Sequence, residues 1–170
     1  MNFLSVFRAA AALCLTVVPV VPAQAQFWQC VTYAREVTGL QIRGNAKTWW
    51  GQAEGRYQRG QRPVPGAVMA MPASGAMPYG HVAVVAKVVS DRELLLDHAN
   101  WSRRGQVERG VRAVDVSAAG DWSRVRIYYA PIGGLGTRTN PVSGFIYTDA
   151  RMADAARDQA RPVQLAMLAD

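Results

Sequence analysis

The order in which helical and strand-like patterns follow one another constrains the fold of this chain more than any other feature. Apolar residues recur at helical spacing over residues 30–38, and Asn45 is a good N-cap for a second helix that runs to Ala53. The patterns that follow, up to residue 129, are strand-like. Helices followed by a series of neighbouring strands are typical of an α+β domain, in which the helices pack on an antiparallel sheet.

The clearest strand pattern is the β-branched run over residues 82–89. A short turn follows it, and residues 93–100 have the pattern of a second strand, so the two predict a hairpin. Residues 112–116 and 123–129 alternate between apolar and polar side chains and predict two further strands. We expect the domain to end near Pro131, ahead of a glycine-rich stretch.

Both ends of the chain are expected to lie outside this domain. Residues 1–25 resemble a secretory signal peptide, with a short basic start, an apolar run and small residues before a cleavage site after Ala25; an uncleaved anchor is the alternative. We therefore expect an exported protein, periplasmic or secreted, with its domain over residues 26–131. Residues 132–170 are expected to form a flexible tail, whose composition suits either an amphipathic helix or a disordered segment.

Cleavage of the signal peptide would remove Cys14 and leave Cys30 as the single cysteine. Cysteines of exported proteins are usually paired, so a lone one indicates either an intermolecular disulfide or a reactive thiol. Cys30 begins the first predicted helix, where free backbone N–H groups and the helix dipole stabilise a thiolate. Cys30 is therefore a candidate nucleophile, and a small buried core residue is the alternative.

The two histidines of the chain lie on the predicted hairpin. His81 begins the first strand, directly after Gly80, and could take the proton of a nearby thiol. His98 and Asn100 are two residues apart on the second strand and should point the same way, so either could accept a hydrogen bond from the His81 ring. The alternative for all three is an ordinary polar strand end.

Charge and motif spacing exclude several classes of function. The chain has 19 Lys and Arg against 12 Asp and Glu, so its surface should attract polyanions such as an anionic cell-wall polymer. Nucleic acid is not expected, because basic and aromatic residues do not interleave on a recognisable module. No metal or cofactor is expected, because paired Cys or His motifs, a phosphate loop and a dinucleotide fingerprint are lacking. After the signal peptide, no segment is apolar enough to predict membrane insertion.

Five short motifs, in this order, resemble the CHAP family, the cysteine, histidine-dependent amidohydrolases and peptidases of the NlpC/P60-like, papain-like superfamily. The motifs are Gln29 to Ala34, Gly44 to Ala46 with Trp49, Pro65 to Val68, Gly80 to Val85, and His98 to Trp101. The resemblance covers roughly residues 27–130 and implies a papain-like fold. It also implies cleavage of peptidoglycan, either as an N-acetylmuramoyl-L-alanine amidase or as an endopeptidase within the peptide.

The same resemblance implies that Cys30 is the nucleophile and His81 the general base. The family commonly places a Glu, and an Asn two positions later, on the next strand; Asn100 matches the Asn, and His98 stands where the Glu is usual. A neutral His98 can accept a hydrogen bond but brings no negative charge. We expect Cys30, His81 and Asn100 to carry the reaction, with His98 taking part. The alternatives are a wall-binding protein with impaired catalysis and a thiol peptidase or amidase acting on a non-wall peptide.

Overall fold

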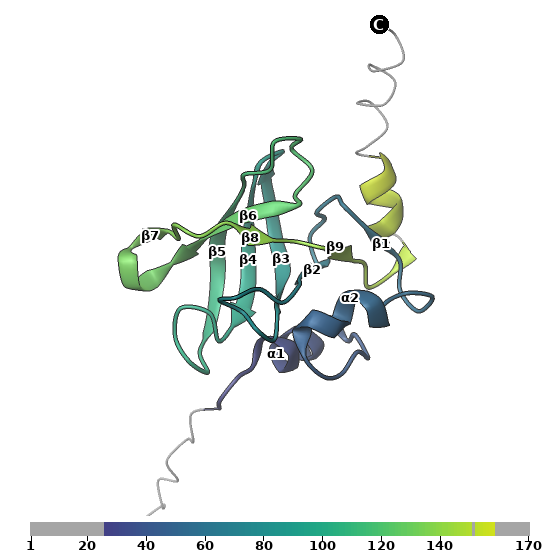
Figure 1. Cartoon of the computed structure of the whole chain (residues 1–170). Coiled ribbons are helices and arrows are strands. Elements are labelled where there is room, and N and C mark those ends of the chain that lie inside the picture. The colour runs from purple at the N-terminus through teal and green to yellow at the C-terminus, as the bar shows by residue number, and fades with distance from the viewer. Residues whose placement is uncertain (1–25, 151, 159–170) are drawn as a thin grey trace, which may run out of the picture.

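The computed structural model describes residues 26–150 and 152–158 (Figure 1). The predicted signal peptide, residues 1–25, and the last part of the predicted tail, residues 159–170, lie outside the described residues. Within the described ranges, no helix combines the length and the apolarity that a membrane span needs.

The helices lie where the N-terminal patterns predict them. α1 spans Cys30–Thr38, and its start is fixed by the Gln29 backbone N–H, which donates to the Thr32 hydroxyl at 3.1 Å. Gly39 ends the helix in a left-handed conformation, with its N–H bonded to the Arg35 carbonyl. After Asn45 the chain forms two short elements, the 3₁₀ helix η1 (Ala46–Thr48) and α2 (Trp49–Gln52).

The strands differ in length and form one sheet, in which every neighbouring pair is antiparallel. In spatial order they are β1 (Arg59–Gly60), β9 (Gly144–Ile146), β2 (Val68–Met71), β3 (His81–Ser90), β4 (Glu93–Ala99), β5 (Val107–Asp115), β6 (Arg124–Tyr129) and β7 (Gly134–Leu135), with β8 (Asn140–Pro141) also paired to β6. The predicted hairpin is β3–β4, and the combination of helices with an antiparallel sheet is confirmed.

β2 and the first half of β3 are buried on both faces of the sheet, and their successive side chains alternate between the two faces. On β3, Val82 and Val84 pack with α1, η1 and α2 on one face of the sheet. Ala83 and Val85 belong to a second apolar cluster on the other face. By the same alternation, His81 falls on the face of Ala83 and Val85. His98 follows Leu94 and Leu96, members of that second cluster.

The segment after residue 131 is not the flexible tail that the sequence predicts. It adds β7, β8 and β9, and Figure 1 shows it crossing from the β6 edge of the sheet to the side of β1. Phe145 and Ile146 are completely buried, one in each apolar cluster. Residues 152–158 are helical. The folded unit therefore extends beyond 131, because both clusters include buried side chains from that segment.

Gly80 allows η1 to approach the beginning of β3 closely. It has a φ of 71°, and a side chain there would come within 2.6 Å of the Lys47 backbone nitrogen and the Met71 carbonyl oxygen. The Lys47 N–H donates to the Tyr79 carbonyl at 2.8 Å and joins the two segments. Gly80 therefore sets the position from which the next residue, His81, extends.

Candidate active site

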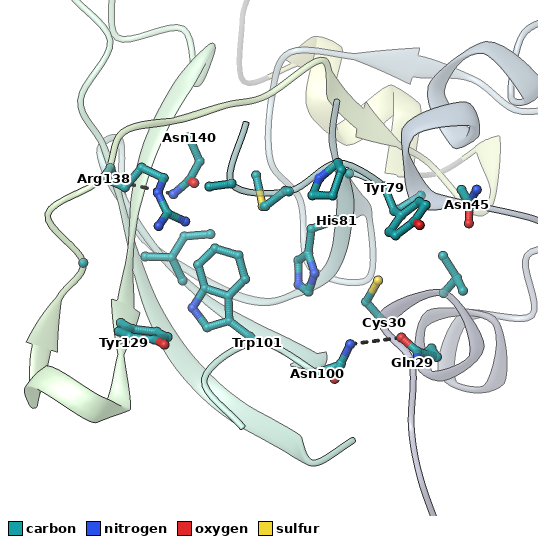
Figure 2. Close-up of a pocket in the computed structure, with 18 of the residues that line it drawn as sticks. Gln29, Cys30, Asn45, Tyr79, His81, Asn100, Trp101, Tyr129, Arg138 and Asn140 are labelled. Atoms are coloured by element: carbon teal, nitrogen blue, oxygen red, sulfur yellow. Dashed lines mark hydrogen bonds between the residues drawn. The ribbon is translucent and has the colours of Figure 1, made fainter. Parts of the chain in front are cut away.

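A pocket of about 760 Å³ lies where the start of α1, the start of β3 and the segment around residues 136–140 meet (Figure 2). Three of the four predicted site residues, Cys30, His81 and Asn100, line this pocket. The fourth, His98, is completely buried and bonded to His81. Figure 2 shows the Cys30 sulfur and the His81 ring pointing into the same part of the pocket.

Cys30 is a free, partly buried thiol at the first position of α1. Burial raises the pKa of the Cys30 thiol, and the backbone N–H groups of Val82, Val31 and Cys30 itself partly offset this effect. Because the raised pKa is the net result, the thiol keeps its proton at neutral pH until a base removes it.

His81 and His98 form a buried pair. His81 Nε2 lies 3.0 Å from His98 Nδ1, and the two side chains are only 4 % and 0 % exposed. Trp101 packs against both rings, with centroid distances of 4.9 Å to His81 and 5.6 Å to His98. The Trp101 indole N–H donates to the Tyr128 carbonyl at 3.0 Å, which fixes the indole in place.

Both histidines are neutral at neutral pH. Burial lowers the pKa of His81 well below its usual value, and the nearby His98 lowers it further. Burial lowers the pKa of His98 to about 3. One proton is shared across the 3.0 Å contact, and when His81 Nε2 carries it, His81 Nδ1 is an unprotonated base.

Asn100 lies beside the pocket but does not bond to the His81 ring. Continuing the register in which Val84 faces Asp97 would place Asn100 opposite His81, but β4 ends at Ala99 and Asn100 has a φ of 60°. Its side chain instead donates to the Gln29 carboxamide oxygen at 3.0 Å and accepts from the Gly105 N–H at 2.8 Å. Asn100 thus joins the turn after β4 to the residue before Cys30.

The family model of the CHAP domain matches residues 21–100. Residues 21–100 belong to the CHAP family. The matched stretch of this CHAP domain contains Cys30, His81, His98 and Asn100, and it ends before β5. No curated protein matches the chain.

One solved structure that the chain resembles is an N-acetylmuramoyl-L-alanine amidase from Staphylococcus aureus. The two are 29% identical with a TM-score of 0.46, and the match covers 58% of this chain and 29% of the amidase chain. The chain therefore matches less than a third of that amidase chain.

The structure adds pocket residues that the sequence analysis did not single out. Gln29 belongs to a CHAP motif, but its contact with Asn100 depends on the turn after β4. Tyr129, Arg138 and Asn140 come from β6 and from the segment that follows it, beyond the matched part of the CHAP domain. No local motif marks these three positions. Among the described residues, no three His, Cys, Asp or Glu side chains gather to hold a metal ion.

The buried histidine pair makes the stability of the folded protein depend on pH. Histidine in the unfolded chain titrates near 6.5, whereas burial lowers the pKa of both in the folded protein. The contribution of the two histidines to the free energy of unfolding is therefore fully present above pH 6.5. It is lost as the pH decreases toward 3, because the unfolded chain then binds more protons than the folded protein. For two histidines, the free energy of unfolding is expected to fall by up to about 2.7 kcal/mol per pH unit.

Urea unfolding between pH 7 and pH 5 measures this dependence. The chain contains only these two histidines, and carboxylates titrate mostly below this window, so the slope reports the pair. Replacing His98 with Asn should reduce the slope by up to half. A free energy of unfolding that stays constant from pH 7 to pH 5 would contradict the prediction.

Proposed function

We propose that this protein is an exported peptidoglycan hydrolase with a papain-like fold, which cleaves an amide bond by a Cys–His thiol mechanism. The observation that carries the proposal is the meeting of Cys30 and His81 in one pocket, within the stretch that belongs to the CHAP family. Cys30 comes from a helix start and His81 from a strand start, so each side chain extends from a rigid element.

In the first step, His81 Nδ1 takes the Cys30 proton as the sulfur attacks the carbonyl carbon of the amide. The tetrahedral intermediate then collapses, the C–N bond breaks, and His81 gives the proton to the leaving amine. Water, deprotonated by His81, attacks the resulting thioester. The acid product leaves, and the Cys30 thiol is restored.

Two donors are available for the oxyanion of the tetrahedral intermediate. The first is the Cys30 backbone N–H at the start of α1, which has no partner within the helix. The second is the carboxamide nitrogen of Gln29, which also lines the pocket. Because the Gln29 oxygen accepts a hydrogen bond from Asn100, its nitrogen is left to donate. In this scheme Asn100 is a positioning residue for Gln29.

His98 takes the position that an acid commonly has in the family. Its Nδ1 accepts the His81 Nε2–H and keeps the His81 ring in the tautomer that leaves Nδ1 as the base. His98 is neutral, so it does not stabilise a thiolate–imidazolium pair in advance. Proton transfer therefore accompanies attack, in agreement with the raised pKa of the Cys30 thiol.

The basic character of the chain supports a wall substrate, since a net charge of +7 favours anionic polymers. The neutral His98 is the observation that favours the second candidate, a wall-binding protein with impaired catalysis. A thiol peptidase or amidase acting on a non-wall peptide would use the same pocket.

Digestion of purified sacculi separates these functions. We expect the protein to release soluble fragments, whose new ends, identified by mass spectrometry, show whether the glycan–peptide amide or a peptide bond is cut. A sample treated with iodoacetamide is the matched control and should release nothing. Binding to sacculi without any release would favour the impaired wall-binding protein. Cleavage of free peptides with intact sacculi would favour the non-wall enzyme.

A further inference from the structure

One wall of the pocket comes from outside the CHAP match. It is lined by Gly136, Thr137 and Arg138, which lie on the loop between β7 and β8, and by Asn140, the first residue of β8. Both flanking strands pair with β6, so the loop is held at its two ends. The Arg126 side chain donates to the Gly136 carbonyl at 2.7 Å and fixes the start of the loop. Pairing with β6 therefore holds this wall of the pocket in place. The wall comes from the C-terminal segment of the chain, outside the stretch that the CHAP model matches.

Among the described residues that line the pocket, Arg138 is the only one with a charged side chain. It is exposed, and within the described part of the chain no carboxylate lies within ion-pair distance of it. Figure 2 shows its side chain extending from the loop toward Trp101. The pocket therefore places one unpaired cation beside an aromatic and apolar surface made by Trp101, Tyr129 and Ile127.

Asn140, two residues further on, has an unused acceptor at the same wall. The side chain is 2 % exposed, and its Oδ1 has no hydrogen-bond partner among the described residues. Its Nδ2 makes long contacts of 3.5 Å to the carbonyls of Val125 and Arg138. A buried acceptor without a partner is costly, so a ligand N–H would be favoured there once the Asn140 side chain turns its covered Oδ1 toward the pocket.

We propose that Arg138 and Asn140 form a subsite for a carboxylate-bearing peptide unit next to the scissile amide. The guanidinium would bind the carboxylate through two parallel hydrogen bonds, and Asn140 Oδ1 would accept the N–H of the adjoining amide. One cation over an apolar surface matches a singly charged carboxylate better than a phosphate. The subsite rests on the proposed amide hydrolysis and defines which amides this pocket selects.

Two synthetic N-acetylmuramoyl peptides that differ only in one carboxyl group, free or amidated, test the subsite. We expect wild type to have a kcat/KM about 10- to 100-fold higher on the free acid, the range of a hydrogen bond to a charged group. Arg138→Gln should remove this preference by lowering kcat/KM on the free acid alone, and Arg138→Lys should keep part of it. Arg124→Gln, an exposed arginine of β6 outside the pocket, should behave as wild type.

Equal kcat/KM of wild type on both peptides, or an unchanged preference in Arg138→Gln, would overturn the subsite. Titration calorimetry with the Cys30→Ala protein measures the affinity for each peptide, and this measurement does not depend on turnover. If wild type cleaves neither peptide, the hydrolase proposal fails, while tighter binding of the free acid that depends on Arg138 still supports the subsite. Stronger competition by inorganic phosphate than by acetate would overturn the carboxylate assignment.

Discussion

Replacing Cys30 with alanine is expected to lower the rate of sacculus cleavage by at least about a thousandfold. The reason is that the sulfur forms the bond to the carbonyl carbon, and no other described side chain that lines the pocket carries a thiol. Alanine removes only the partly buried sulfur from the first turn of α1 and keeps a good helix former there. Release of dye from labelled sacculi measures the loss.

The control for this variant is a check that Cys30→Ala folds like wild type. The circular dichroism spectrum and the melting temperature of Cys30→Ala should stay close to those of wild type, because the substitution removes a single, partly buried atom. Cys30→Ser tests the chemistry further, since a hydroxyl of similar size is a much weaker nucleophile and should also be inactive. Dye release by Cys30→Ala at a rate within tenfold of wild type would contradict the thiol mechanism.

Replacing His98 is expected to have the next largest effect, and the direction depends on the replacement. His98→Ala removes the acceptor of the His81 Nε2–H and should lower kcat/KM about a hundredfold, because the ring loses its fixed tautomer. His98→Glu places a carboxylate beside His81, which should raise the pKa of His81 and stabilise a thiolate–imidazolium pair. The pKa of the Cys30 thiol should then fall.

The rate of Cys30 alkylation by iodoacetamide as a function of pH distinguishes this positioning role from a purely structural one. In wild type the rate should rise only at alkaline pH, because the pKa of the thiol is raised. In His98→Glu, alkylation at pH 7 should be at least about tenfold faster than in wild type, because more of the thiol is ionised. Identical alkylation profiles in wild type, His98→Ala and His98→Glu would show that His98 only fills space.

Local patterns in the sequence were enough to predict the elements that carry Cys30 and His81. The helix that begins at Cys30 ends at Gly39, and the strand that begins at His81 follows Gly80, so both elements are marked by a few neighbouring residues. The placement of His98 beside His81 followed from the hairpin as one of two alternatives. The catalytic roles of these residues, and export, stay predictions.

The features that sequence analysis did not predict depend on long-range pairing or on the exact end of a strand. β9 is three residues long, too short for a period, and it pairs with β2 across a wide separation in the chain, Val68 with Ile146. Asn100 was expected to share a face with His98, but that rule holds only while the strand continues. The left-handed turn at Asn100 directs its side chain to Gln29 instead.

The position of β9 between β1 and β2 sets an order of events in folding. Until residues 144–146 are available, β1 and β2 have no common partner, and β2 presents an open edge beside β3. The helices and the β3–β4 hairpin can form from local contacts, but the sheet closes only when nearly the whole domain has been synthesised. A nascent chain therefore carries Cys30 and His81 long before their pocket is complete.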